Sequence, residues 1–177
     1  MVATIDEFEK SKEFFQIGDI RSTLESYERA IEHIDRSESG IKAELLAFLD
    51  KILQYTRDND LKSEEAMALR EIGRTHTKFK NHVEGLKYSY QALKIQKKIG
   101  KKLDIAESLA FLAEDLEVSG NYDECIKTFN EAAEVFHELG KLRKEKELKK
   151  EVSRLKSFSK NVVEDEYFRN KFHIDKY

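Results

Sequence analysis

The side chains best able to support metal or nucleophilic chemistry are five histidines and one cysteine, and neither has the spacing that such chemistry needs. No two histidines stand four residues apart with a glutamate between them, as a zinc hydrolase requires; they are His33, His76, His82, His137 and His173. The lone Cys125 excludes an intrachain disulfide and a multi-cysteine metal site. The seven glycines do not cluster into a phosphate-binding loop. We therefore expect no enzyme, no metal and no cofactor.

Charge is high and unevenly distributed. Charged residues make up 38% of the 177, with a net charge of −3. Acidic residues dominate 1–40 and 121–140, whereas nine basic and three acidic residues occupy 141–160. A basic end could contact nucleic acid or acidic lipid. Because the chain is acidic overall and its basic segment lacks interleaved aromatics, nucleic acid is not favoured. Close carboxylates such as Glu114, Asp115 and Glu117 are typical of a solvated helix face.

Helices must position these side chains. Prolines are absent, and apolar residues recur at helical spacing almost throughout. We expect an all-α chain with eight helices, over 4–16, 19–37, 41–57, 63–79, 82–99, 103–118, 122–139 and 141–158. Short loops between them predict antiparallel hairpins. No apolar run is long enough to span a membrane, and the first residues are acidic where a signal peptide is apolar. We expect no membrane contact and a cytoplasmic protein.

A shift of 40 residues superimposes one helical hairpin on the next. The small and large apolar positions coincide, as does the glycine after the second helix. The matched residues are Ala66 with Ala106, Leu69 with Leu109, Ile72 with Leu112, Ala92 with Ala132, and Gly100 with Gly140.

The unit at 106–139 resembles a tetratricopeptide repeat, a helix–turn–helix of 34 residues. Nine residues fit that pattern: Leu109, Leu112, Ala113, Leu116, Gly120, Tyr122, Cys125, Phe129 and Ala132. The unit at 66–99 agrees at Leu69, Ile72, Gly73, Gly85 and Ala92, and departs at Lys80, His82 and Ser89. A partial match over 4–37 has Gly18 at the turn, followed by Ile20, Tyr27 and Ala30. The 40-residue spacing is similar to the longer repeats of kinesin light chains and bacterial peptide-sensing regulators.

The resemblance implies a right-handed α-solenoid of antiparallel helical hairpins over 1–158, with about eight helices and a short C-terminal segment. Hairpins of this kind stack to bury their apolar faces, so the end needs a polar cap. Helix 141–158 fits that role, with a thin apolar stripe of Leu142, Leu148, Val152 and Leu155. The tail at 159–177 is either a capping or a docking segment. Helix 41–57 is either an extra helix or the start of a decayed repeat whose second helix is 63–79. Cys125 is predicted to be a buried packing thiol.

The resemblance also implies a concave groove lined by the first helix of each pair. The residues at the groove positions are Met67, Arg70, Glu71, Arg74, Lys78, Glu107, Phe111, Glu114, Glu117 and Val118. Arg70, Arg74 and Lys78 recur at four-residue steps and so share one helix stripe. They either offer a cationic wall to a partner or pair internally with Glu107, Glu114 and Glu117. Asparagines that clamp a carboxylate in chaperone-binding relatives are absent from these positions, so we do not expect that mode.

The predicted function is that of a protein–protein interaction adaptor or scaffold, which binds a segment of a partner in the groove. The partner is another protein or a peptide, with an acidic segment as one option. The alternative is a regulatory peptide-sensing module, in which peptide binding changes the curvature of the stack. A nucleic-acid binder that uses the basic helix ranks third. The sequence leaves a homo-oligomer open.

Overall fold

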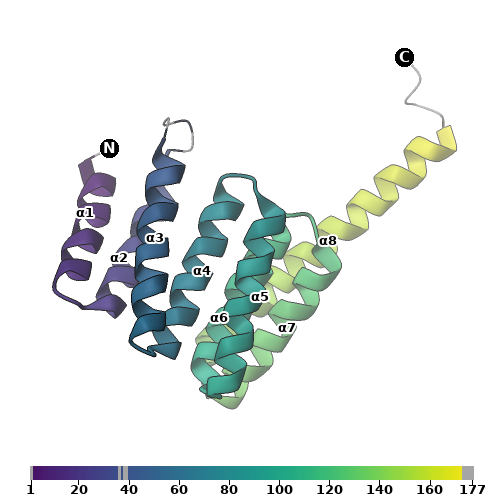
Figure 1. The fold of residues 1–177 in the computed structure, drawn as a ribbon. Coiled ribbons are helices and arrows are strands. Elements are labelled where there is room, and N and C mark those ends of the chain that lie inside the picture. Colours follow the sequence, from purple (N-terminus) through teal and green to yellow (C-terminus); the bar gives the residue numbers. More distant parts are fainter. Residues whose placement is uncertain (1, 36, 38–39, 173–177) are drawn as a thin grey trace.

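The computed structural model describes residues 2–35, 37 and 40–172, and gives side-chain surroundings for 7–35, 37 and 40–158. The described residues form eight helices and no strand, so the all-α prediction is confirmed. The helices are α1 (Val2–Gln16), α2 (Ile20–His33), α3 (Ile41–Asp58), α4 (Lys62–Lys78), α5 (His82–Ile99), α6 (Lys102–Val118), α7 (Tyr122–Glu138) and α8 (Leu142–Phe172). They stack side by side in chain order as a helical solenoid (Figure 1).

The even-numbered helices form one row, which we call the inner row. In this row α2 contacts α4 through Glu28 and Arg70, whose charged groups lie 3.3 Å apart. Helix α4 contacts α6 through Arg70, whose guanidinium carbon lies 4.1 Å from the centre of the Phe111 ring. Helix α6 contacts α8 through an ion pair of 2.7 Å between Glu117 and Arg154.

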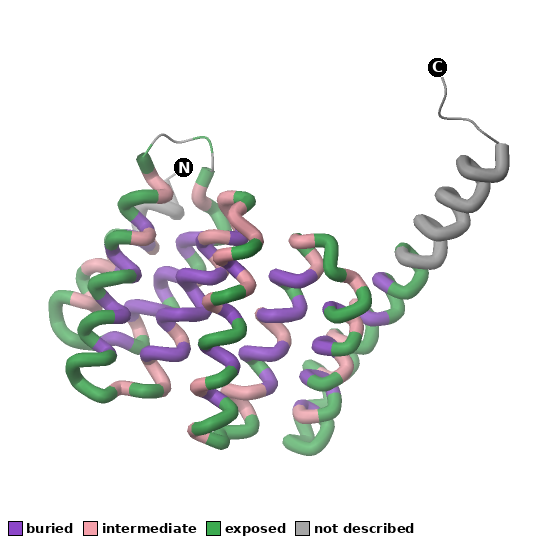
Figure 2. The backbone as a smooth tube through the Cα atoms, turned by 45° about the vertical axis from the view of Figure 1, so that its right-hand side comes forward, coloured by how far each residue is buried: buried purple, intermediate pink, exposed green. Residues whose placement is uncertain are grey.

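The odd-numbered helices form the outer row. Helices α1 and α3 meet edge to face through Phe8 and Phe48, with ring centres 5.5 Å apart. Helices α5 and α7 are joined by a 3.0 Å ion pair between Lys97 and Glu131. Figure 2 shows buried residues recurring at helical intervals along the packed helices, with exposed residues on their other faces. This is the pattern of amphipathic helices that share a core.

Small residues let the two helices of a pair approach closely. A Cβ atom on Gly85 would lie 2.2 Å from Thr77 Oγ1 and 3.1 Å from the Gly73 carbonyl oxygen. Both distances are too short, so the backbones of α4 and α5 are in contact and exclude any larger side chain. In the pair α6 and α7, Ala113 and Cys125 occupy the equivalent positions and are fully buried.

The same tight turn connects most of the helices, including one that lacks the expected glycine. Between α6 and α7, Gly120 has a φ of 83°, and the Asn121 amide donates to the Leu116 carbonyl. Between α4 and α5, Lys80 has a φ of 62°, and Asn81 donates to His76 in the same way. A side chain in this left-handed region costs about 1–2 kcal/mol. The turn is therefore kept at Lys80 in spite of local strain.

Helix α3, whose role the sequence left open, lies in the outer row. Its Phe48 ring stacks on Tyr27 of α2 with ring centres 6.4 Å apart, and Leu45 and Ile52 are fully buried. Helix α4 lies in the inner row beside α6, so it is the equivalent of α6 and not the second helix of a pair that α3 begins. Helix α2 also lies in the inner row. The assignment of a repeat to 4–37 stays a prediction.

Helix α8 contains the expected cap helix and is longer than expected. It continues without a break from the predicted end at 158 to Phe172, because no glycine or proline interrupts the helical sequence. Val152 and Leu155 are buried against the preceding helices, as the stripe predicts. Leu142 is 61% exposed, so the stripe begins after it. The last predicted tail residues, 173–177, lie outside the described residues.

No helix in the described part of the chain combines the length and the apolar character needed to cross a lipid bilayer.

We predict that Ala132→Leu destabilises the fold. Ala132 is fully buried on α7, and added methylene groups in a filled core cost about 1–3 kcal/mol. Urea denaturation measures the change in the free energy of unfolding. Ala47→Leu is the matched control, because Ala47 is exposed in the middle of α3. Equal stabilities of the two variants would contradict the packing described above.

Candidate functional site

The inner row is hollowed by three cavities, which together we call the inner groove. The largest, of about 630 Å³, lies between α2, α4 and α6. A second, of about 380 Å³, lies between α6 and α8. The smallest, of about 180 Å³, lies between the first three turns of α2 and α4, the start of α6 and the end of α5.

Eight of the ten predicted groove residues line the inner groove. Those of the largest cavity are Arg70, Arg74, Lys78, Phe111, Glu114 and Val118. Met67 and Glu107 line the smallest cavity. Glu71 and Glu117 line none of the three: Glu71 is fully buried, and Glu117 is paired with Arg154. Their role in binding a ligand stays a prediction.

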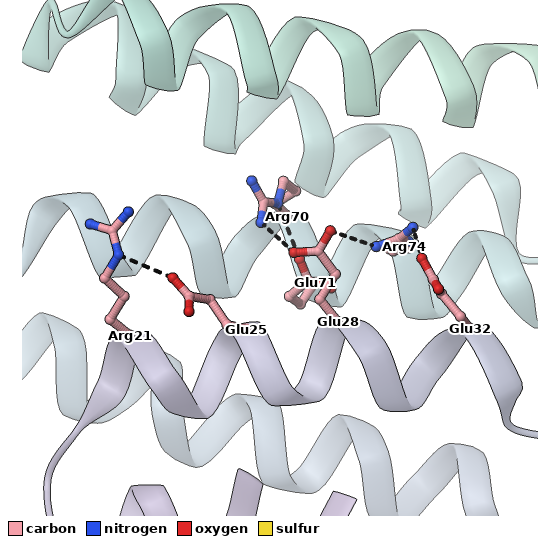
Figure 3. A network of polar contacts seen from close by, with 7 residues as sticks. All are labelled: Arg21, Glu25, Glu28, Glu32, Arg70, Glu71 and Arg74. Atoms are coloured by element: carbon pink, nitrogen blue, oxygen red, sulfur yellow. Dashed lines mark hydrogen bonds and ion pairs between the residues drawn. The ribbon is translucent and has the colours of Figure 1, made fainter. Parts of the chain in front are cut away.

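The cationic stripe of α4 is held by glutamates of α2. Arg70 lies 3.3 Å from Glu28, and Arg74 lies 3.3 Å from both Glu28 and Glu32. Figure 3 shows Glu28 between the two arginines, so that one carboxylate bridges them. We call this row of ion pairs between α2 and α4 the α2–α4 seam. Because the pairs are partly buried, dissolved salt screens them less than it screens surface pairs.

The third cation of the stripe, Lys78, closes the end of α2. Its Nζ donates to the main-chain carbonyls of Ile31 and Glu32, the latter at 2.9 Å. The last carbonyls of a helix have no partner within the helix and carry partial negative charge, so an ammonium group is favourable there. Lys78 therefore stabilises the C-terminal turn of α2.

The internal pairing that the sequence suggested comes from a different helix. The sequence left internal pairing with Glu107, Glu114 and Glu117 of α6 as one of two alternatives. The direct ion pairs come instead from Glu28 and Glu32 of α2, and Glu114 adds a longer-range attraction to Arg74. Glu117 instead pairs with Arg154 of α8 at 2.7 Å. The physical reason is that the stripe lies between α2 and α6: the carboxylates of α2 reach the guanidiniums, whereas α6 presents the Phe111 ring to them.

The buried carboxylate of Glu71 binds one arginine of the α2–α4 seam. Glu71 is fully buried, and its Oε1 accepts a hydrogen bond of 3.1 Å from Arg70 Nε. Its Oε2 has no hydrogen-bond partner in the described residues. Burial raises the pKa of the Glu71 carboxyl, and the nearby guanidiniums of Arg70 and Arg74 oppose that rise. The ion pair with Arg70 is what allows a charge at this depth.

Phe111 presents an aromatic face to the same arginines. The guanidinium carbons of Arg70 and Arg74 lie 4.1 Å and 5.1 Å from the ring centre. Such stacking contributes about 0.5–2 kcal/mol per pair, depending on desolvation. The ring is only partly buried and lines both the largest cavity and the one between α6 and α8. It is thus an aromatic surface in the middle of the groove.

One wall of the largest cavity was not predicted from the sequence, and it comes from the C-terminal end of α2 and the residues that follow it. Its residues are Ile31, Glu32, Ile34 and Asp35. Carboxylates at Glu25, Glu28 and Glu32 recur at three- and four-residue steps and so share a face. That spacing could have indicated a charged wall, but the sequence pattern does not say in which row α2 lies.

Cys125 is a buried thiol, as predicted. It is fully inaccessible, and burial raises its pKa to about 12. The reactive thiolate is therefore disfavoured at neutral pH. In the described residues no three His, Cys, Asp or Glu side chains lie close enough together to hold a metal ion.

A sequence model of the tetratricopeptide repeat family matches residues 64–138, which run from the first turn of α4 to the end of α7. A comparison with curated proteins finds no match to this chain.

We predict slow labelling of Cys125 by a thiol reagent, because the folded protein gives the reagent no access. Labelling in urea supplies the reference rate. A rate in buffer close to that in urea would show that the thiol is exposed.

We predict that Arg70→Met strongly destabilises the fold. It leaves the buried Glu71 carboxylate without its ion pair, a change that costs about 3–5 kcal/mol. Arg21→Met is the matched control, because Arg21 forms an exposed pair with Glu25, worth about 0–1 kcal/mol. Urea denaturation measures both variants. Adding Glu71→Leu to Arg70→Met should restore stability, because no buried charge is then left unpaired. Equal stability of Arg70→Met and Arg21→Met would refute the role of the α2–α4 seam.

Proposed function

We propose that this chain is an adaptor that binds a segment of a partner protein in the inner groove. The support is that residues 64–138 match a sequence model of the tetratricopeptide repeat family, whose repeats are generally protein–protein interaction modules. The groove crosses the four inner helices α2, α4, α6 and α8 and is lined by both apolar and charged groups. Extended or helical peptide segments are recognised in grooves of this kind.

The observation that carries the proposal is the position of Phe111. Its ring lies at the boundary of two cavities and is backed by two guanidiniums. Val118, which is 62% exposed, adds an apolar rim to the larger cavity. An aromatic anchor beside arginine is typical of the few residues that supply most of the affinity at an interface.

The proposal does not require an acidic partner. The sequence offered an acidic segment as one option, because Arg70, Arg74 and Lys78 share a stripe. These cations are already engaged with Glu28, Glu32 and the end of α2. An acidic segment would have to displace those groups before it gained their charge.

The test is a quantitative pull-down with the full chain as bait, followed by affinity measurement with the captured partner. We predict that Phe111→Ala and Val118→Gln each weaken binding about tenfold, because an aromatic or apolar anchor at an interface contributes at least about 1–2 kcal/mol. Val83→Gln is the matched control: Val83 is 79% exposed at the start of α5 and lines none of the three cavities.

Circular dichroism melting curves check that the variants remain folded. Partner affinity that is unchanged in Phe111→Ala and Val118→Gln would exclude the inner groove as the binding surface. Affinity lost equally in Val83→Gln would move the interface to the outer row.

A further inference from the structure

The smallest cavity of the inner groove combines narrow size with an unusual surplus of hydrogen-bond acceptors. Its volume of about 180 Å³ has room for one long side chain and not for a folded segment. Its lining comes from α2, α4, α5 and α6, so four helices fix its shape.

Two of its carboxylates are unengaged. Asp104 and Glu107 stand three residues apart on α6 and so share a face. Neither carboxylate forms an ion pair or a hydrogen bond with another residue in the part of the chain that the structure describes. Solvent reaches both, with Glu107 the more exposed. They are therefore available to a ligand that enters the cavity.

An independent observation also points to a ligand that donates hydrogen bonds. Gln96 of α5 lines the cavity and is only 3% exposed, and its Oε1 has no hydrogen-bond partner among the described residues. Buried acceptors are almost always satisfied, because an unpaired one is unfavourable. An incoming donor group would satisfy it.

The cations that line this cavity are already occupied. Arg21 pairs with Glu25 at 3.2 Å, as Figure 3 shows, and Arg70 pairs with Glu28 and Glu71. Four carboxylates and two guanidiniums line the cavity, so its net charge is −2. The charge left uncompensated in the cavity is therefore negative, and the groups that carry it are hydrogen-bond acceptors.

We propose that this cavity binds the side chain of a lysine or arginine in the partner segment. The inference rests on the proposed function, since it names a side chain that the groove's partner must carry. The cationic head would donate to Asp104, Glu107 and Gln96 Oε1, and the thioether of Met67 would contact the aliphatic stem. The partner segment is thus basic at this position, in contrast to the acidic segment that was one option from the sequence.

The experiment observes the cavity directly through Met67. The chain has two methionines, Met1 and Met67, so ¹³C-methyl-methionine labelling of the full chain gives a simple spectrum, which Met67→Leu assigns. The probes are N-acetyl-arginine methylamide and N-acetyl-lysine methylamide, with N-acetyl-norleucine methylamide as the uncharged control. We expect a saturable shift of the Met67 signal over about 1–10 mM with the two basic amides only, as weak single-residue binding implies.

Variants test the acceptors. Asp104→Asn combined with Glu107→Gln should weaken binding of the basic amides about tenfold, because charge-assisted hydrogen bonds become neutral ones. The matched control is Asp123→Asn combined with Glu134→Gln, which makes the same change in net charge at two exposed positions of α7. It should leave the titration unchanged. Gln96→Leu removes the buried acceptor without a change in charge and should also weaken binding.

The outcomes separate this inference from the proposed function. A Met67 signal that does not move with the basic amides, or moves equally with the norleucine amide, overturns the basic-side-chain assignment even if a partner binds the groove. Basic amides that bind at Met67 support the assignment, and it stands even if Phe111→Ala and Val118→Gln keep full partner affinity. In that case the adaptor role of the groove would fail.

Discussion

The inner row depends on the environment of one side chain, Arg70. Its guanidinium is nearly inaccessible and contacts Glu28 on α2, Glu71 on its own helix and the Phe111 ring on α6. A buried cation is tolerated only while its counter-charges stay within hydrogen-bond range. The rotations of α2 and α6 about their axes are therefore tied to that of α4. The lining of the groove follows, because the same rotation decides which side chains of each helix face inward.

The distance between paired helices is set by different side chains in the two halves of the stack. Between α4 and α5, Gly73 and Gly85 bring the backbones into contact, and α6 and α7 use small residues at the same positions. Near the N-terminus the rings of Tyr27 and Phe48 separate α2 from α3, and Tyr27 reaches across to hydrogen-bond Thr75 on α4 at 2.7 Å. Close packing of small residues repeats along residues 64–138. At the N-terminal end of the stack, aromatic rings fill the wider space between α2 and α3, which lie outside that segment.

The charge pattern of the groove bears on the charge of the partner segment proposed above. A stripe of three cations would attract an acidic segment if it faced solvent, but Glu28, Glu32 and the end of α2 hold it within the fold. What remains available is the partly exposed ring of Phe111 and, on α6, the carboxylates of Asp104 and Glu107, which have no ion-pair or hydrogen-bond partner among the described residues. If a partner segment binds in the groove as proposed, its specificity would come from apolar contact and from acceptors, and a wrong partner would be rejected where its own carboxylate met Glu107 or Glu114.

The sequence by itself determined the helices, the 40-residue repeat over α4 to α7 and the small buried positions such as Cys125 and Ala132. These features depend on helical periodicity and on residue size, which are local properties of the chain. It also placed Arg70, Arg74 and Lys78 on one stripe, and Phe111 among the groove residues.

Only the tertiary structure decided what that stripe contacts, that α2 lies in the inner row, that Leu142 is exposed, and that Gln96 and Asp104 share a cavity. These facts depend on the rotation and offset of helices that are distant in the sequence, and the periodicity of a helix is the same for every such rotation. The rotation is chosen collectively, by the packing of side chains from several helices and by the need to pair each buried charge.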